Sequence, residues 1–100
     1  MSIDEFFAHT KLKKLLNLPE SFRSKIFGTN KLTTDEKFIL ANLYYLDSVG
    51  NLLEFKTLLP PLTGYSQQKC ELILTELNKK NFIYMRKNQV SLRIKPLTYE

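Results

Sequence analysis

The spacing of apolar residues changes near residue 81, and this change constrains the fold more than any other feature of the sequence. Before it, apolar residues recur at the intervals of one buried helix face: Cys70, Ile73, Leu74 and Leu77. After it, they alternate with polar residues, as in a half-buried strand: Val90, Leu92 and Ile94. Residues 82–85 are strong β-formers, and residues 86–89, in which Asn88 tolerates positive φ, predict a tight turn. The sequence therefore predicts a helix capped by Ser66 and then a β-hairpin.

An earlier helix has a clear start signal. Thr33 and Glu36 have the spacing of a capping box, and a broad apolar set follows as far as Val49. Gly50 supplies a left-handed stop. Leu52 and Leu53 then predict a very short strand. Residues 55–59 predict one or two helical turns, which the prolines at 60 and 61 interrupt.

The predicted order is thus helix, short strand, short helix, turn, helix and hairpin. A short helix joined by a turn to a capped helix is the helix-turn-helix arrangement, and the basic hairpin takes the place of a wing. We predict a mainly α fold with a small β-hairpin, a winged helix-turn-helix domain over residues 32–97. An extra helix is expected before it, within a helical extension over residues 1–31.

The apolar residues of this extension suggest a role of their own. From Ile3 to Leu16 they fall near helical spacing. They either pack on the domain itself or form the interface of a homodimer, since half-site spacing in DNA often mirrors a two-fold dimer. The prediction favours dimerisation, through Phe6, Phe7, Leu12, Leu15 and Leu16.

Charge is distributed unevenly along the chain. Residues 1–31 carry six basic and three acidic side chains, residues 32–78 three and six, and residues 79–100 six and one, which gives +3, −3 and +5. A polyanion would therefore bind mainly at the two ends. The alternative is that the lysines serve only solubility.

The proposed partner is double-stranded DNA. Its major groove, about 12 Å wide, admits the first turn of a helix, where Gln can pair with adenine and Lys with guanine. Backbone phosphates would meet the basic hairpin. The predicted DNA-binding residues are Ser66, Gln67, Gln68, Lys69, Arg86, Lys87, Arg93 and Lys95. The alternative is that the capped helix binds protein, since it also carries Glu71 and Glu76.

Several other functions find no support in the sequence. It has no glycine-rich phosphate loop, no nucleophile beside a recognisable base and no paired carboxylates in an apolar setting. His9 has no His or Cys partner at metal-ligand spacing, and Cys70 fits an inert core thiol. Tyr44, Tyr65 and Tyr84 fit the core or its edge, which leaves little for stacking on single strands. We expect no enzyme, no metal and no cofactor.

The cellular compartment is inferred from two observations. Residues 1–5 lack the basic start of a signal peptide. No apolar run reaches the roughly 18 to 20 residues that span a bilayer. We therefore expect a cytoplasmic protein with no membrane partner.

The sequence also resembles a known family. Ser66, Gln67, Gln68, Lys69 and Cys70, followed by Leu74, Leu77, Asn81, Phe82 and Ile83, resemble the recognition helix and wing entry of bacterial winged-helix proteins. More narrowly, residues 22–97 resemble the N-terminal winged-helix domain of DnaD-type primosome proteins and related plasmid or phage replication initiators. The segments that carry this resemblance are 32–36, 50–53, 91–92 and 96–97.

The resemblance implies a role in DNA replication initiation and self-association through the N-terminal region. The chain departs from the family where Leu59, Pro60 and Pro61 break the usual second helix. The family's C-terminal DNA-binding domain has no counterpart in these residues. Two other functions stay open, a small transcriptional regulator of the same fold and a protein-interaction adaptor that does not bind DNA.

Overall fold

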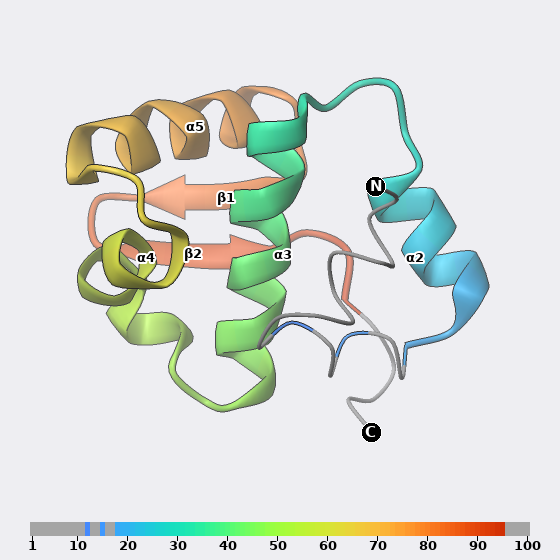
Figure 1. Ribbon diagram of the computed structural model, residues 1–100, viewed down its shortest axis with the longest axis horizontal. Coiled ribbons are helices and arrows are strands. Elements are labelled where there is room, and N and C mark those ends of the chain that lie inside the picture. The colour runs from blue at the N-terminus through green and yellow to red at the C-terminus, as the bar shows by residue number, and fades with distance from the viewer. Residues whose placement is uncertain (1–11, 13–14, 16–17, 96–100) are drawn as a thin grey trace.

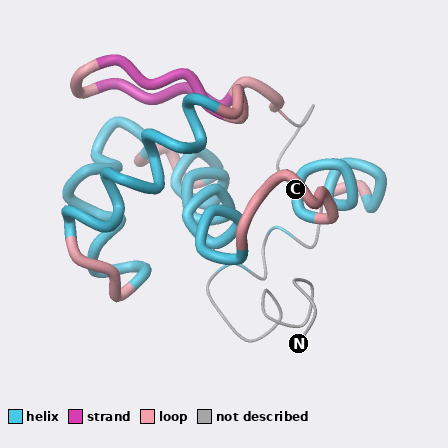
Figure 2. The backbone as a smooth tube through the Cα atoms, turned by 90° about the horizontal axis from the view of Figure 1, so that it is seen from above, coloured by secondary structure: helices cyan, strands magenta, loops and turns pink. Residues whose placement is uncertain are grey.

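The structure, a computed structural model, describes residues 12, 15 and 18–95 (Figure 1). Helix α3 crosses in front of a two-stranded antiparallel hairpin, and α2 lies apart from α4 and α5 (Figure 1). The described helices all lie on one side of the hairpin (Figure 2). In chain order the elements are α2 (Glu20–Phe27), α3 (Thr34–Ser48), the 3-10 helix η2 (Leu52–Glu54), α4 (Phe55–Thr63), α5 (Gln67–Lys79), β1 (Ile83–Arg86) and β2 (Gln89–Leu92).

This order confirms the predicted fold class, mainly α with a small β-hairpin. Helices α4 and α5 form the helix-turn-helix, and the hairpin that follows α5 is the wing. The predicted helix over residues 3–16 lies outside the described residues, apart from Leu12 and Leu15. Within the predicted extension, α2 is the helix that the structure describes.

Both predicted helix starts are confirmed. The Thr33 backbone N–H donates to Glu36 Oε1 at 2.8 Å, and the Glu36 N–H donates to Thr33 Oγ1 at 3.2 Å, which completes the capping box of α3. At α5, Ser66 Oγ accepts a hydrogen bond from the Lys69 N–H at 3.1 Å. These bonds use donors that a helix otherwise leaves without partners, so each start is fixed by the residues around it.

Helix α4 continues through Pro60 and Pro61, so the predicted interruption is wrong. The two proline nitrogens cannot donate to the carbonyls of Lys56 and Thr57. Thr57 is exposed and Lys56 is only partly buried, so both residues lie at or near the surface of the molecule. The helix then closes at Gly64, which has φ +77° and donates its N–H to Pro60 O at 2.8 Å. The helix-turn-helix is therefore complete.

Leu52 and Leu53 do not form the predicted short strand. They lie in η2, where the Glu54 N–H donates to Asn51 O at 3.1 Å. This local bond satisfies the backbone without a ladder, and the sheet in the described part of the chain has only the two strands of the hairpin. Leu53 is consequently turned to solvent.

The hairpin has the predicted tight turn, and its loop is two residues long. Arg86 is paired with Gln89 across it, and the register continues to Ile83 opposite Leu92. The positive φ falls on Lys87, at +49°, and not on Asn88 as predicted. Hairpin loops of two residues match the strand twist when the first central residue has positive φ. This requirement explains why the positive φ is found at Lys87.

The core lies between α3, α5 and the inner face of the hairpin. It also includes residues from α2, α4 and the segment before α2. Its buried apolar members are Leu12, Leu15, Leu18, Ile26, Phe27, Leu32, Ile39, Leu40, Ala41, Leu43, Tyr44, Leu46, Phe55, Leu59, Cys70, Ile73, Leu74, Leu77, Ile83 and Leu92. Cys70 is therefore a buried free thiol, as predicted.

Tyr44 joins three parts of this core. Its ring makes edge-on contacts with Phe22 and Phe27 of α2, with centroids 5.6 and 6.1 Å apart. Its hydroxyl donates to the backbone carbonyl of Ile94, just after the hairpin. Burial, with a smaller effect from Asp47, raises the pKa of Tyr44, so this hydroxyl keeps its proton.

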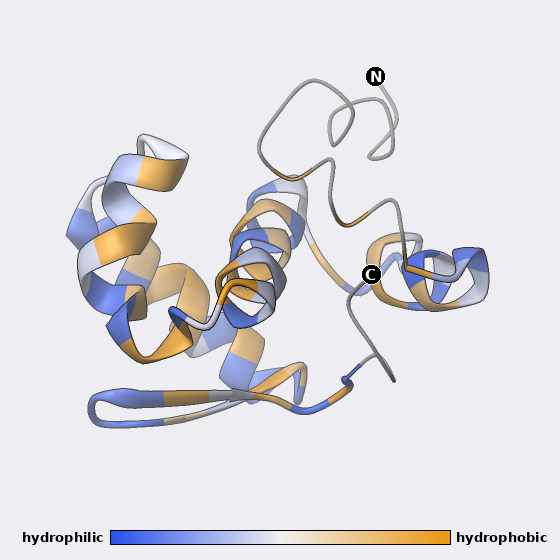
Figure 3. Cartoon of the chain, turned by 90° about the horizontal axis from the view of Figure 1, so that it is seen from below, coloured by the Kyte–Doolittle hydropathy of each residue, from blue (hydrophilic) through white to orange (hydrophobic). Residues whose placement is uncertain are grey.

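The distribution of polarity follows from this packing. Apolar residues face the interior, while the tip of the hairpin is hydrophilic (Figure 3). In the part of the chain that the structure describes, the helices are too short or too polar to cross a lipid bilayer.

Candidate nucleic-acid interface

The first turn of α5 is on the surface, as the sequence predicted. Ser66, Gln67 and Gln68 are all exposed. Because the Ser66 hydroxyl oxygen is the cap of the helix, its main role is to hold this turn in place. The two glutamine amides are left at the surface with both donors and acceptors to offer.

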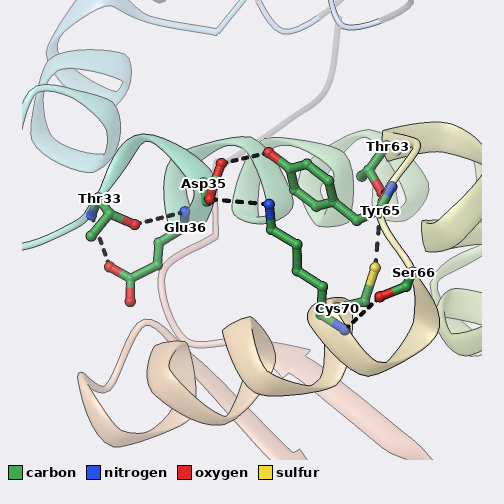
Figure 4. A network of polar contacts seen from close by, with 8 residues as sticks. Thr33, Asp35, Glu36, Thr63, Tyr65, Ser66 and Cys70 are labelled. Carbon is green, nitrogen blue, oxygen red and sulfur yellow. Dashed lines mark hydrogen bonds and ion pairs between the residues drawn. The ribbon is translucent and has the colours of Figure 1, made fainter.

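Lys69 is held by the protein itself. Its Nζ lies 3.4 Å from Asp35 Oδ2 and 4.0 Å from the centre of the Tyr65 ring. The Tyr65 hydroxyl donates to Asp35 Oδ1 at 2.6 Å, so Asp35 joins the first turn of α3 to the start of α5 (Figure 4). In the sequence, Asp35 is recognisable only as an acidic residue near a helix start. Its partners are at least 30 positions away, which local patterns cannot show.

Titration properties agree with this geometry. The hydrogen bond from Tyr65 lowers the pKa of Asp35, and Lys69 lowers it further, against a smaller opposing effect of burial. Burial and the bond to Asp35 raise the pKa of Tyr65 to about 12. At neutral pH the site is therefore a carboxylate held between a protonated phenol and an ammonium group.

A second lysine binds the neighbouring carboxylate. Lys80, just after α5, places its Nζ 2.7 Å from Glu36 Oε1. Burial raises the pKa of Glu36, which is only 5% exposed, but the bonds from Lys80 and Thr33 outweigh it, and the pKa lies below its ordinary value. Two adjacent carboxylates of α3 thus hold the two ends of α5. Asp35 binds Lys69 near its start, and Glu36 binds Lys80 just after its end.

The outer face of α5 is not basic. Glu71 and Thr75 are exposed, and Lys79 lies 3.5 Å from Glu76. Between them Leu72 is 65% exposed. On α5, the side chains best suited to base edges are therefore the amides of Gln67 and Gln68 in the first turn.

The hairpin tip carries the accessible positive charge. Arg86 and Lys87 are exposed, and among the described residues no carboxylate lies within ion-pair distance of either. Lys56 of α4 donates to Asn88 Oδ1 at 2.8 Å, which adds a third cation beside the tip. The tip lies at the same end of the molecule as the start of α5 (Figures 1 and 2).

Arg93 and Lys95 lie at the other end of the hairpin. The Arg93 N–H donates to Phe82 O at 3.3 Å, so Arg93 follows the last pair of the ladder. The ladder spans three residue steps, or roughly 10 Å. The four predicted basic residues are therefore divided between the tip and the base of one ribbon, and both pairs are exposed.

The predicted dimer residues fall into two groups. Leu12 and Leu15 are buried in the core of the chain itself, so they offer a partner almost no surface. Phe6, Phe7 and Leu16 lie outside the described residues.

Comparisons of the chain with protein-family models, with curated proteins and with solved structures found no match.

Proposed function

We propose that this chain is a winged-helix module that binds double-stranded DNA. The observation that carries the proposal is the position of Arg86 and Lys87, which form no ion pair with any described residue, at the same end of the molecule as the exposed first turn of α5 (Figure 1). A duplex approached from this end meets phosphate-binding charges and base-reading amides together. Positive charge alone would not distinguish DNA from other polyanions, but its place next to a capped helix start does.

Each residue then has a distinct task. Gln67 and Gln68 face base edges in the major groove, where an amide pairs well with adenine. Arg86 and Lys87 bind phosphates near the tip, and Arg93 and Lys95 do so at the base of the hairpin. Lys69 reaches DNA only if it leaves Asp35, so it contributes less than the sequence alone indicates.

The cellular role that we propose is DNA replication initiation of the plasmid, phage or primosome type. Its support is the resemblance of residues 22–97 to the DnaD-type N-terminal domain. The same resemblance supports self-association through residues 1–31. A small transcriptional regulator is the alternative within the fold, and it predicts tight binding to a single palindromic site, whereas an initiator module binds duplexes more evenly.

The test is fluorescence anisotropy with a labelled mixed-sequence duplex. We expect binding that weakens steeply between about 50 and about 200 mM salt, because bound phosphates release counterions. Absence of binding even at the lower salt would refute the proposal. Sedimentation of the same sample measures whether the protein is a dimer.

A protein-interaction adaptor is the second candidate, and Leu72 is the observation that favours it. This side chain is exposed in the middle of α5 next to Glu71, where DNA would meet an apolar group and a negative charge. An adaptor would keep its partner or oligomer but bind no duplex. The substitution Leu72→Glu would then disrupt its assembly, while a DNA module would show no change in oligomeric state.

A further inference from the structure

The outer face of the hairpin carries an exposed aromatic ring. Tyr84 was predicted at the core or its edge, but it is 46% exposed. Its neighbours Ile83 and Met85 turn inward, toward the helices, and Tyr84 therefore turns outward. Opposite it in the register is Ser91, which is too small to cover the ring.

An arginine lies on the same face. The Arg93 guanidinium carbon is 5.5 Å from the centre of the Tyr84 ring, and Arg93 Nε donates to the backbone carbonyl of Ile83 at 3.4 Å. Arg86 follows on the outer side of the same strand as Tyr84. Residues 79–95 contain no Asp or Glu, so this face has positive charge only.

The described helices leave this face open. All of them pack on the opposite side of the hairpin, which forms one edge of the molecule in two views (Figures 2 and 3). The surface is thus one face of the ribbon, with the Tyr84 ring near its centre, the Arg93 guanidinium over one side of that ring, and Arg86 toward the tip. It includes none of the residues proposed to read bases at the first turn of α5, but it shares Arg86 and Arg93 with the proposed duplex phosphate contacts.

We infer that this face binds single-stranded DNA, with an unpaired base stacked on Tyr84 and the adjoining phosphates held by Arg86 and Arg93. Stacking on an aromatic ring needs a base whose face is free, and bases inside a duplex are already stacked. The charge of the ribbon selects a polyanion over a protein surface. The inference extends the proposed function, because a single strand that leaves a bound duplex would meet this second surface.

The test compares two labelled ligands, an oligothymidine of about 15 nucleotides and a mixed-sequence duplex, with the full chain. In Tyr84→Ala, we expect the Kd for the single strand to rise about 5- to 150-fold, the range that corresponds to the loss of one stacked base. The Kd for the duplex should change less than about twofold. Tyr84→Phe keeps the ring and should bind the single strand as the unaltered protein does. Tyr84→Leu keeps apolar area without the ring and should behave like Tyr84→Ala.

Three results would overturn the inference. They are a single-strand Kd unchanged in Tyr84→Ala, equal binding by Tyr84→Leu and Tyr84→Phe, or tighter binding of an oligouridine RNA of the same length. Thermal unfolding of each variant checks that the hairpin is intact, and the exposure of Tyr84 predicts little change. Duplex binding without single-strand binding would refute only this inference, whereas failure to bind either ligand would refute the proposed function as well.

Discussion

Replacing the two cations at the hairpin tip should flatten the salt dependence of DNA binding by a calculable amount. Five basic side chains lie on or beside the hairpin outside any ion pair in the described residues: Lys56, Arg86, Lys87, Arg93 and Lys95. If each binds one phosphate, log K falls with log salt at a slope of about −4.5. Between about 50 and about 200 mM salt, affinity then falls about 500-fold.

The double variant Arg86→Ala, Lys87→Ala retains three of these contacts. Its slope should be about −2.7, so affinity should fall only about 40-fold over the same interval. Binding should weaken for every duplex alike, because phosphate contacts carry no sequence information. Anisotropy titrations at four or more salt concentrations measure the slope directly.

A matched control removes two charges elsewhere. Lys25 and Lys31 are exposed. Lys25 belongs to α2, which lies on the far side of the molecule from the hairpin tip (Figure 1), and Lys31 lies in the loop between α2 and α3. The variant Lys25→Ala, Lys31→Ala has the same net charge as the tip variant but should keep the original slope. If both variants change the slope equally, the effect comes from net charge, and the assignment of the tip to the DNA interface is wrong.

Three further predictions concern the scaffold that holds the interface. Thr33→Ala should lower the free energy of unfolding by about 1 kcal/mol in urea titrations, since it removes half of the capping box, whereas Thr34→Ala, one residue into the helix, should cost less. The carboxylate of Glu36 stabilises the fold above the unfolded-state pKa, and this contribution is lost as pH falls through its lowered folded pKa. The free energy of unfolding should therefore drop below about pH 5, and Glu36→Gln should show a smaller drop; equal pH profiles would contradict the role of the carboxylate. Gly64→Ala should lower the free energy of unfolding by about 1 kcal/mol. The cause is the positive φ alone, because no atom lies within 4 Å of the added Cβ. Asn tolerates positive φ better than Ala, so thermal unfolding should show a larger loss in Tm for Gly64→Ala than for Gly64→Asn.

Local signals in the sequence predicted much of the fold. The starts of α3 and α5 depend on Thr33 and Ser66, whose partners lie three residues away. The hairpin depends on alternation over a few residues, and its two-residue turn follows from the strand register. Such short patterns can be recognised in the sequence because both residues of each interaction lie within the same short segment.

Other features depend on context that no short segment contains. Pro60 and Pro61 remain helical although neither can donate a helical hydrogen bond. The residues four positions before them lie at or near the surface, and the packing of α4 decides that exposure. The 3-10 helix at residues 52–54 forms backbone hydrogen bonds within its own turn. A strand at this position would instead have needed hydrogen bonds to a strand of the hairpin.

The charged part of the candidate site was the hardest to predict. The sequence predicts Lys69 as a free cation, but in the structure it forms an ion pair with Asp35. These two residues are 34 positions apart in the sequence. Tyr84 shows the opposite case, because a tyrosine in an amphipathic strand fits either face until the register is fixed. Both depend on tertiary contacts between elements that the sequence places far apart.

The hydrogen bond from Tyr44 to the carbonyl of Ile94 sets where the domain can end. The last ladder residue is Leu92, but a chain cut there would lose the acceptor of a buried phenol. An unpaired buried hydroxyl costs about 1 to 3 kcal/mol, a sizeable part of what holds a domain of this size together. The smallest autonomous unit therefore extends past the hairpin to residue 94. Because the same ring packs on Phe22 and Phe27, shortening the chain after the hairpin would also loosen α2.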